Sequence, residues 1–328
     1  MHEFAATATE RLKALVERLA ASEVRQLAGD ASTRLYYRVR LDDDQTRIIA
    51  VLPEPFEPDQ LPFLDTLALL QTLTIRVPRV YESMGPDGIL VLEDLGDRLL
   101  QNEVTHRRAD KRQLYAEAID LLTKLQIGAR DLSPRSHLAL RIAFDDRKFR
   151  EELSFFRTHF LEGLRGARLD VEDGLALEAS FENIARELAS QTYALCHRDY
   201  HSRNLIRCSD DELAVIDFQD ARLGPRVYDL VSLMNDSYVV HTVELVKEMT
   251  ERFSRALGVD VANEYDLAAL QRNLKALGTF GYQIVHRANE VYRPYLAPTL
   301  GLVRDNLVRN SRFATLRRVL ARQLPELQ

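Results

Sequence analysis

The chain has few of the residues that build disulfide or zinc scaffolds. Among its 328 residues it holds two cysteines, Cys196 and Cys208, and no tryptophan. Two thiols cannot form a disulfide framework or a four-ligand zinc site, so we expect both to be reduced and partly buried. The lack of tryptophan excludes no function.

Long apolar runs and a basic excess are also missing. No apolar stretch approaches the roughly 18 residues that a membrane-spanning helix needs, and the first residues lack the basic and apolar segments of a signal peptide. We therefore expect a cytoplasmic protein with no membrane partner. The formal net charge of −6 argues against a nucleic-acid partner, because such proteins usually carry a basic excess.

Strand patterns dominate the first part of the chain. Apolar and polar residues alternate over 35–41, and 46–52 is a more continuously apolar strand that ends at Pro53. Two shorter strand candidates lie at 76–81 and 88–93. Apolar residues at helical spacing also predict helices over 5–22 and 57–73.

The pattern beyond residue 95 is mainly helical. A β-like stretch at 193–217 interrupts helices expected at 109–128, 146–163, 174–190, 226–239, 242–257 and 266–287. The sequence thus predicts an α+β protein with two lobes. Residues 1–95 would form a small antiparallel β-rich lobe, and residues 96–328 a large, mainly α-helical one.

One block of residues carries the chemistry. His197, Arg198 and Asp199 are followed after four residues by Asn204, and then by an apolar strand that ends in Asp217. We expect Asp199 to receive the proton of an acceptor hydroxyl, and Asn204 with Asp217 to supply the hard oxygen ligands that Mg²⁺ prefers. His197 and Arg198 would brace the loop. Each residue alone has an ordinary structural explanation, but chance is a poor account of the whole set at this spacing.

The same block resembles the aminoglycoside phosphotransferase superfamily, which has the protein-kinase-like fold. More narrowly, it resembles the bacterial anomeric sugar kinases that phosphorylate N-acetylmuramate and N-acetylglucosamine at C1 in cell-wall recycling. The resemblance implies ATP as phosphoryl donor, Mg²⁺ as cofactor and a small sugar as acceptor. It rests on the segments 197–205, 216–225 and 228–230, with support from 29–34, 92–96, 235–238 and 277–281.

The resemblance also places nucleotide-binding residues by their order in the chain. One loop would cover the phosphates, and a hinge after the last small-lobe strand would offer backbone groups to the adenine. Ordinary turns explain both segments about as well. The expected contacts are Gly29, Ser32, Thr33, Arg34, Glu93, Asp94 and Leu95.

One departure from the kinase pattern concerns a lysine. Kinases of this fold carry a lysine on the third strand, paired with a glutamate on the next helix, but no lysine lies between residues 14 and 110. We expect Arg34 to substitute, because it directly follows the phosphate loop and can donate a fork of hydrogen bonds to phosphate oxygens. Arg47, or a larger share of charge on the metal, is the alternative. Glu57 would be the helix partner.

The charge distribution bears on the acceptor. Residues 263–328 carry a net charge of +5 and the rest of the chain −11, which a solvated helical surface would explain. A pocket for polycationic aminoglycosides should be acidic, so the tail favours a neutral or anionic sugar. The lactyl carboxylate of N-acetylmuramate would then pair with an arginine such as Arg287. Further candidate sugar contacts are His201, Asp220, Arg222 and Asp236.

Two competing functions stay open at this point. One is an antibiotic-resistance kinase of the aminoglycoside type on the same fold. The other is a nucleotide-binding pseudokinase scaffold, for which the missing lysine is the only support. A protein kinase is disfavoured because a helix follows Asp217 within a few residues and leaves little room for an activation loop. The sequence marks neither the sugar, the hydroxyl nor an oligomeric interface.

Overall fold

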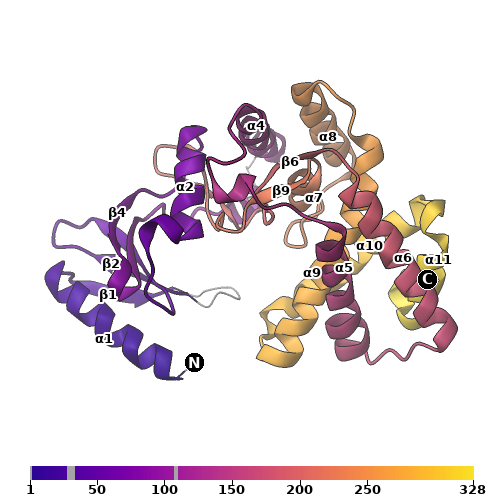
Figure 1. The fold of residues 1–328 in the computed structure, drawn as a ribbon, viewed down its shortest axis with the longest axis horizontal. Coiled ribbons are helices and arrows are strands. Elements are labelled where there is room, and N and C mark those ends of the chain that lie inside the picture. Colours follow the sequence, from indigo (N-terminus) through magenta and orange to yellow (C-terminus); the bar gives the residue numbers. More distant parts are fainter. Residues whose placement is uncertain (1, 28–33, 107–109) are drawn as a thin grey trace. The chain divides into compact units, whose positions relative to one another are not determined.

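The computed structural model of the protein describes residues 2–27, 34–106 and 110–328 (Figure 1). The chain forms two compact units. The first consists of Met1–Arg98 and Ile206–Gln219, and the second of Leu99–Leu205 and Asp220–Gln328. A lobe boundary at residue 95 stays a prediction.

The first unit is built around an antiparallel five-stranded sheet of order β1-β2-β3-β5-β4. Helix α1 (His2–Arg18) packs Leu12 and Leu15 against the sheet residues Val39, Ile49 and Val51. Helix α2 (Pro62–Thr72) follows the third strand. The strands are β1 (Glu23–Gln26), β2 (Leu35–Arg40), β3 (Thr46–Val51), β4 (Val80–Met84) and β5 (Ile89–Glu93).

The strand predictions hold where one face of the strand is buried. Those at 35–41, 46–52 and 88–93 match β2, β3 and β5 closely. Strand β4 begins at Val80, later than expected, after Pro78, which has no N–H to donate to a ladder. The sequence does not reveal β1, because all four of its residues are exposed and show no alternation.

A short hairpin, β7 (Leu205–Arg207) with β8 (Leu213–Val215), belongs mostly to the first unit. The N–H of Val215 donates to the carbonyl oxygen of Arg76 at 2.9 Å, and Phe218 stacks on Phe63 of α2 with ring centroids 5.0 Å apart. The hairpin therefore holds residues up to Gln219 against the small unit.

The second unit is mainly helical, so the predicted α+β architecture is confirmed. Helix α9 runs through its centre, buried over most of its length, and packs against α5, α6, α7, α10 and a π-helix at Phe156–Leu164 (Figure 1). Strands β6 and β9 form an antiparallel pair. The elements are α3 (Leu100–Thr105), α4 (Lys111–Ala129), α5 (Asp146–Phe155), α6 (Val171–Ala189), β6 (Tyr193–Cys196), β9 (Arg222–Pro225), α7 (Tyr228–Met234), α8 (Val243–Leu257), α9 (Ala262–Arg287), α10 (Leu296–Arg309) and α11 (Ala314–Gln323).

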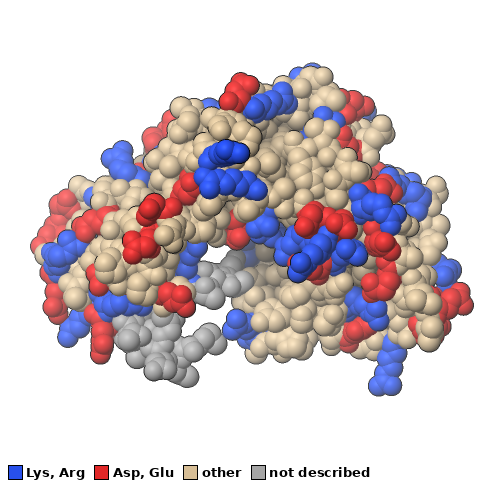
Figure 2. All heavy atoms as spheres, viewed as in Figure 1, with Lys and Arg blue, Asp and Glu red and all other residues tan. Residues whose placement is uncertain are grey.

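No helix among the described residues is long and apolar enough to cross a membrane. On the face shown in Figure 2, acidic and basic side chains are interspersed. Much of the basic charge near the C-terminus is paired with carboxylates of the same unit: Arg309 with Asp266, and both Arg318 and Arg322 with Asp173.

Candidate active site

The loop His197–Asn204 follows β6 and is fixed by a buried carboxylate. Asp229, in the first turn of α7, accepts hydrogen bonds from the backbone N–H groups of His197 (2.5 Å) and Arg198 (2.9 Å). Arg198 has φ +81°, a backbone conformation that side chains with a Cβ rarely adopt. These two hydrogen bonds stabilise that conformation. The side chain of His197, the first residue of the loop, is only 1% exposed.

The side chain of Arg198 ties the loop to neighbouring elements. Its guanidinium lies 3.4 Å from the buried carboxylate of Glu152 on α5 and 3.3 Å from Asp220 before β9. Glu152 also accepts a hydrogen bond from Gln271 of α9 (2.8 Å). The side chain of Arg198 therefore joins the loop to α5 and to the segment before β9.

Asp199 follows Arg198 in the loop, and 32% of its side chain is exposed. Its Oδ1 is 3.2 Å from Nζ of Lys275 and 3.4 Å from Nη2 of Arg272, both on α9. Burial by itself raises the pKa of Asp199, but Lys275, Arg272 and Arg198 together hold it well below the usual range. The carboxylate is thus ionised at neutral pH.

Sequence reasoning missed Arg272 and Lys275. They lie three residues apart, so they share one face of α9, and the remaining neighbours on that segment are mostly buried. The available signal was two cations, three residues apart, beside the leucines Leu270, Leu274 and Leu277. The sequence does not indicate which carboxylate Arg272 and Lys275 contact.

The two expected magnesium ligands belong to different units and are described separately. Asn204, in the second unit, donates from Nδ2 to the backbone oxygen of Asp199 (2.9 Å), so its amide oxygen faces away from that bond. Asp217, in the first unit, is exposed with φ +61°, and its Oδ1 accepts from Gln219 (2.9 Å). Each offers an oxygen of the kind that Mg²⁺ prefers, so both residues fit the expected metal.

A comparison with known protein families covers the loop His197–Asn204 and Asp217 together. Residues 23–271 match the model of the phosphotransferase enzyme family, APH, which is more than half of the chain. The chain belongs to this family. It is therefore an ATP-dependent phosphotransferase with a protein-kinase-like fold.

Several relatives of this phosphotransferase have the same name, N-acetylmuramate/N-acetylglucosamine kinase. The Pseudomonas aeruginosa protein is 29% identical over 81% of this chain and 78% of its own length. The Neisseria meningitidis protein is 27% identical over 88% and 87%, and the Pseudomonas putida protein 30% identical over 79% and 76%.

Solved structures similar to the phosphotransferase support the fold alone, because their sequences are distant. The choline kinase LicA from Streptococcus pneumoniae has a TM-score of 0.63 at 15% identity, covering 92% of this chain and 99% of its own. The gentamicin-APH(2")-IIa complex has a TM-score of 0.61 at 17% identity, covering 89% and 95%.

The expected nucleotide contacts of the phosphotransferase lie in the first unit. Gly29, Ser32 and Thr33 are outside the described residues. The guanidinium of Arg34 lies 6.0 Å from the centroid of the Phe63 ring. Arg47, the alternative cation, stacks 4.0 Å from the ring of Tyr81.

Both acidic side chains of the expected hinge are already bonded. The carboxylate of Glu93 accepts two hydrogen bonds from Arg76 (2.6 and 2.8 Å), and Asp94 accepts from Arg38 (2.8 Å) and from the N–H of Gly96 (3.0 Å). Leu95 is buried. Because these side chains are already bonded or buried, we expect the hinge to contact the adenine through its backbone groups.

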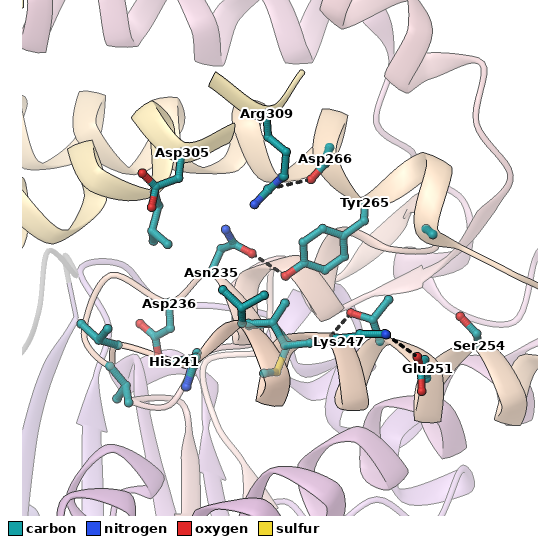
Figure 3. A pocket seen from close by; sticks show the side chains of 18 of the residues that line it. Asn235, Asp236, His241, Lys247, Glu251, Ser254, Tyr265, Asp266, Asp305 and Arg309 are labelled. Atoms are coloured by element: carbon teal, nitrogen blue, oxygen red, sulfur yellow. Dashed lines mark hydrogen bonds and ion pairs between the residues drawn. The ribbon is translucent and has the colours of Figure 1, made fainter. Parts of the chain in front are cut away.

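One of the expected sugar contacts, His201, belongs to the loop His197–Asn204, and another, Asp236, bonds to Ser202 of the same loop. Buried Asp236 accepts from the N–H and the hydroxyl of Ser202 (3.0 and 2.5 Å), and it also lines a cavity of about 1010 Å³ (Figure 3). His201 packs edge-on against Tyr238, and burial lowers its pKa to about 3, so it is neutral at pH 7. Asp199 is not among the residues that line this cavity.

The other expected sugar contacts lie in two places. Asp220 is 3.3 Å from Arg198 and 3.8 Å from Arg222. Arg287 is exposed near the end of α9, its guanidinium 6.0 Å from the Tyr282 ring centroid. It lies 12 residues beyond Lys275, or about 18 Å along the helix axis.

A further residue of the loop escaped the sequence reasoning. The guanidinium of Arg203 lies 3.9 Å from the ring centroid of Tyr238 and 5.0 Å from that of Tyr295, and it donates to the hydroxyl of Tyr295 (2.6 Å). The tyrosines lie 35 and 92 residues along the chain from Arg203, so no local pattern could have joined them.

Proposed function

We propose that this phosphotransferase is an anomeric sugar kinase, which transfers the γ-phosphoryl of ATP to the C1 hydroxyl of N-acetylmuramate or N-acetylglucosamine in cell-wall recycling. The names of the relatives support the acceptor class, and the match to them covers most of their length. Because the reaction consumes ATP, we place it in the cytoplasm.

The observation that carries the proposal is the environment of Asp199. Two cations on α9 share the negative charge of its Oδ1, while its side chain stays one-third exposed toward an acceptor. A carboxylate neutralised in this way is a weak base. It suits an acceptor hydroxyl that gives up its proton readily, and a hemiacetal hydroxyl is more acidic than an ordinary alcohol.

The proposed reaction needs little covalent help from the protein. Asp199 orients the hydroxyl in line with the γ-phosphorus and takes its proton as the new O–P bond forms and the bond to the β-phosphate oxygen breaks, releasing ADP. Asn204 and Asp217 are the proposed ligands of Mg²⁺, which when bound would neutralise charge on the phosphates. Asp229, His197 and Arg198 keep the loop in place.

The competing functions fit these contacts less well. An aminoglycoside brings several positive charges, which Arg272 and Lys275 beside Asp199 would repel. A pseudokinase scaffold has no need of Asp199, Asn204 and Asp217 together, nor of a carboxylate that braces the loop that carries Asp199 and Asn204.

The test is an ADP-release assay with ATP, Mg²⁺ and separate acceptors. The acceptors are N-acetylmuramate, N-acetylglucosamine, their C1 methyl glycosides and kanamycin, and Asp199→Asn serves as the inactive control. We expect turnover of the free sugars alone, with ³¹P–¹H NMR placing the phosphate on C1. Turnover of the glycosides, or of kanamycin alone, would refute the proposal.

A further inference from the structure

Arg272 and Lys275 are two cations that share a single carboxylate. Within the described residues, Asp199 is the only acidic group in an ion pair with either of them, and both contact the same oxygen, Oδ1. The other cation near the loop, Arg198, is already paired with Glu152 and Asp220. In direct ion pairs, one positive charge of the α9 pair lacks a matching negative charge, and the carboxylate of Glu152 attracts both cations only from farther away.

Burial makes this excess costly. Only 12% of the Arg272 side chain and 15% of the Lys275 side chain are exposed, so water screens the two like charges poorly. Arg272 is held in this position by the hydroxyl of Ser232, which accepts from Nε at 2.9 Å. Burial and the neighbouring Arg272 also lower the pKa of Lys275, although Asp199 opposes them. A second anion at this position would relieve the repulsion.

We propose that Arg272 and Lys275 bind a carboxylate of the acceptor and thereby select an acidic amino sugar over its neutral counterpart. This inference rests on the proposed sugar-kinase function. The two sugars in the relatives' names differ by the lactyl ether on C3, which carries a carboxylate two ring carbons from C1. A sugar whose C1 hydroxyl meets the exposed side of Asp199 therefore presents that carboxylate close to the cations on Oδ1.

The position of the pair distinguishes it from Arg287. Arg287 lies about 18 Å farther along α9 than Lys275, beyond the reach of a group two carbons from the reacting hydroxyl. Arg272 and Lys275 lie much closer to the reacting hydroxyl, because both contact Asp199, which orients that hydroxyl in the proposed reaction.

The test compares acceptors that differ only in charge. Values of kcat/KM are measured for N-acetylmuramate and for its methyl ester with wild type, Lys275→Met and Lys13→Met. Lys13 is an exposed lysine of α1 and serves as the matched control. We expect wild type and the control to prefer the acid about 10- to 100-fold, and Lys275→Met to lose most of this preference. Thermal melting of each variant establishes that it is folded.

The ratio of kcat/KM for the acid to kcat/KM for the ester distinguishes loss of carboxylate recognition from damage to Asp199. A loss common to both acceptors reports on Asp199, whereas a changed ratio reports on the carboxylate. Equal turnover of acid and ester by wild type, or an unchanged preference in Lys275→Met, would overturn the inference and leave the sugar-kinase function standing. No turnover of any sugar would instead overturn the proposed function. Lys275→Arg, which keeps the charge, should retain part of the preference.

Discussion

Gly281 of α9 lies directly against the backbone of His159 in the π-helix. A Cβ at this position would lie 2.7 Å from the carbonyl carbon of His159 and 2.9 Å from Cα of Phe160. Gly278, one turn earlier, would meet the backbone of Phe156 at 2.8 Å. Glycine at these positions lets two helix backbones approach closely, and Arg272 and Lys275 lie on the preceding turns of the same helix.

The first prediction is that Gly281→Ala destabilises the protein by about 1–3 kcal/mol, because backbone atoms cannot move aside as a flexible side chain would. Gly174→Ala is the matched control, since a Cβ in that part of α6 meets nothing within 4 Å. The control should gain up to about 1 kcal/mol from the better helix propensity of alanine. Urea unfolding measures both, and equal stability of the two variants would contradict the close contact.

The second prediction concerns the brace of the catalytic loop. Asn at position 229 keeps the shape of Asp229 but lacks one of the two acceptor oxygens that meet His197 and Arg198. We expect Asp229→Asn to lower kcat about 100-fold through misplacement of Asp199, with a smaller change in KM for ATP. Asp146→Asn, which alters an exposed ion pair on α5, should leave kcat unchanged. An unchanged kcat in Asp229→Asn would show that the loop holds its conformation without the carboxylate.

The sequence predicted the parts of the molecule that depend on local pattern. Strands β2 and β3 have buried faces, and their alternation is visible in the chain. The contact of Asp199 with Arg272 and Lys275 spans 73 and 76 residues, so it depends on how α9 packs and not on spacing. The motif predicted Asp199 as the base, but it could not predict which cations pair with that carboxylate.

The third prediction tests the substitute for the missing lysine. If Arg34 contacts the phosphates of ATP, Arg34→Ala should weaken ATP binding about 10- to 100-fold, as expected for the loss of charge-assisted hydrogen bonds. Arg47→Ala should have a smaller effect, since Arg47 already donates to Gln45 (2.7 Å) and stacks on Tyr81. Fluorescence titration with a labelled ATP analogue measures both. Unaltered binding and turnover in Arg34→Ala would make the assignment wrong.

The last prediction follows from the surroundings of His241. Its ring packs edge-on against Tyr115, with centroids 4.5 Å apart, and its Nδ1 is buried without a hydrogen-bond partner among the described residues. Burial lowers the pKa of His241 to about 4 from the ordinary value of 6.5. Below pH 6.5 the unfolded chain binds a proton here that the folded chain does not accept until about pH 4. Stability is therefore lost as the pH falls across this window, by up to about 3 kcal/mol.

His241→Gln should remove this contribution, because glutamine does not titrate. The free energy of urea unfolding, measured from pH 4.5 to 7.5, should fall less steeply with acidification in His241→Gln than in wild type. His106→Gln, which alters an exposed imidazole, should follow the wild-type slope. Other buried groups titrate alike in all three proteins, so the difference between the curves isolates His241. Parallel curves for His241→Gln and wild type would mean that the folded protein accepts a proton at this ring as readily as the unfolded chain does.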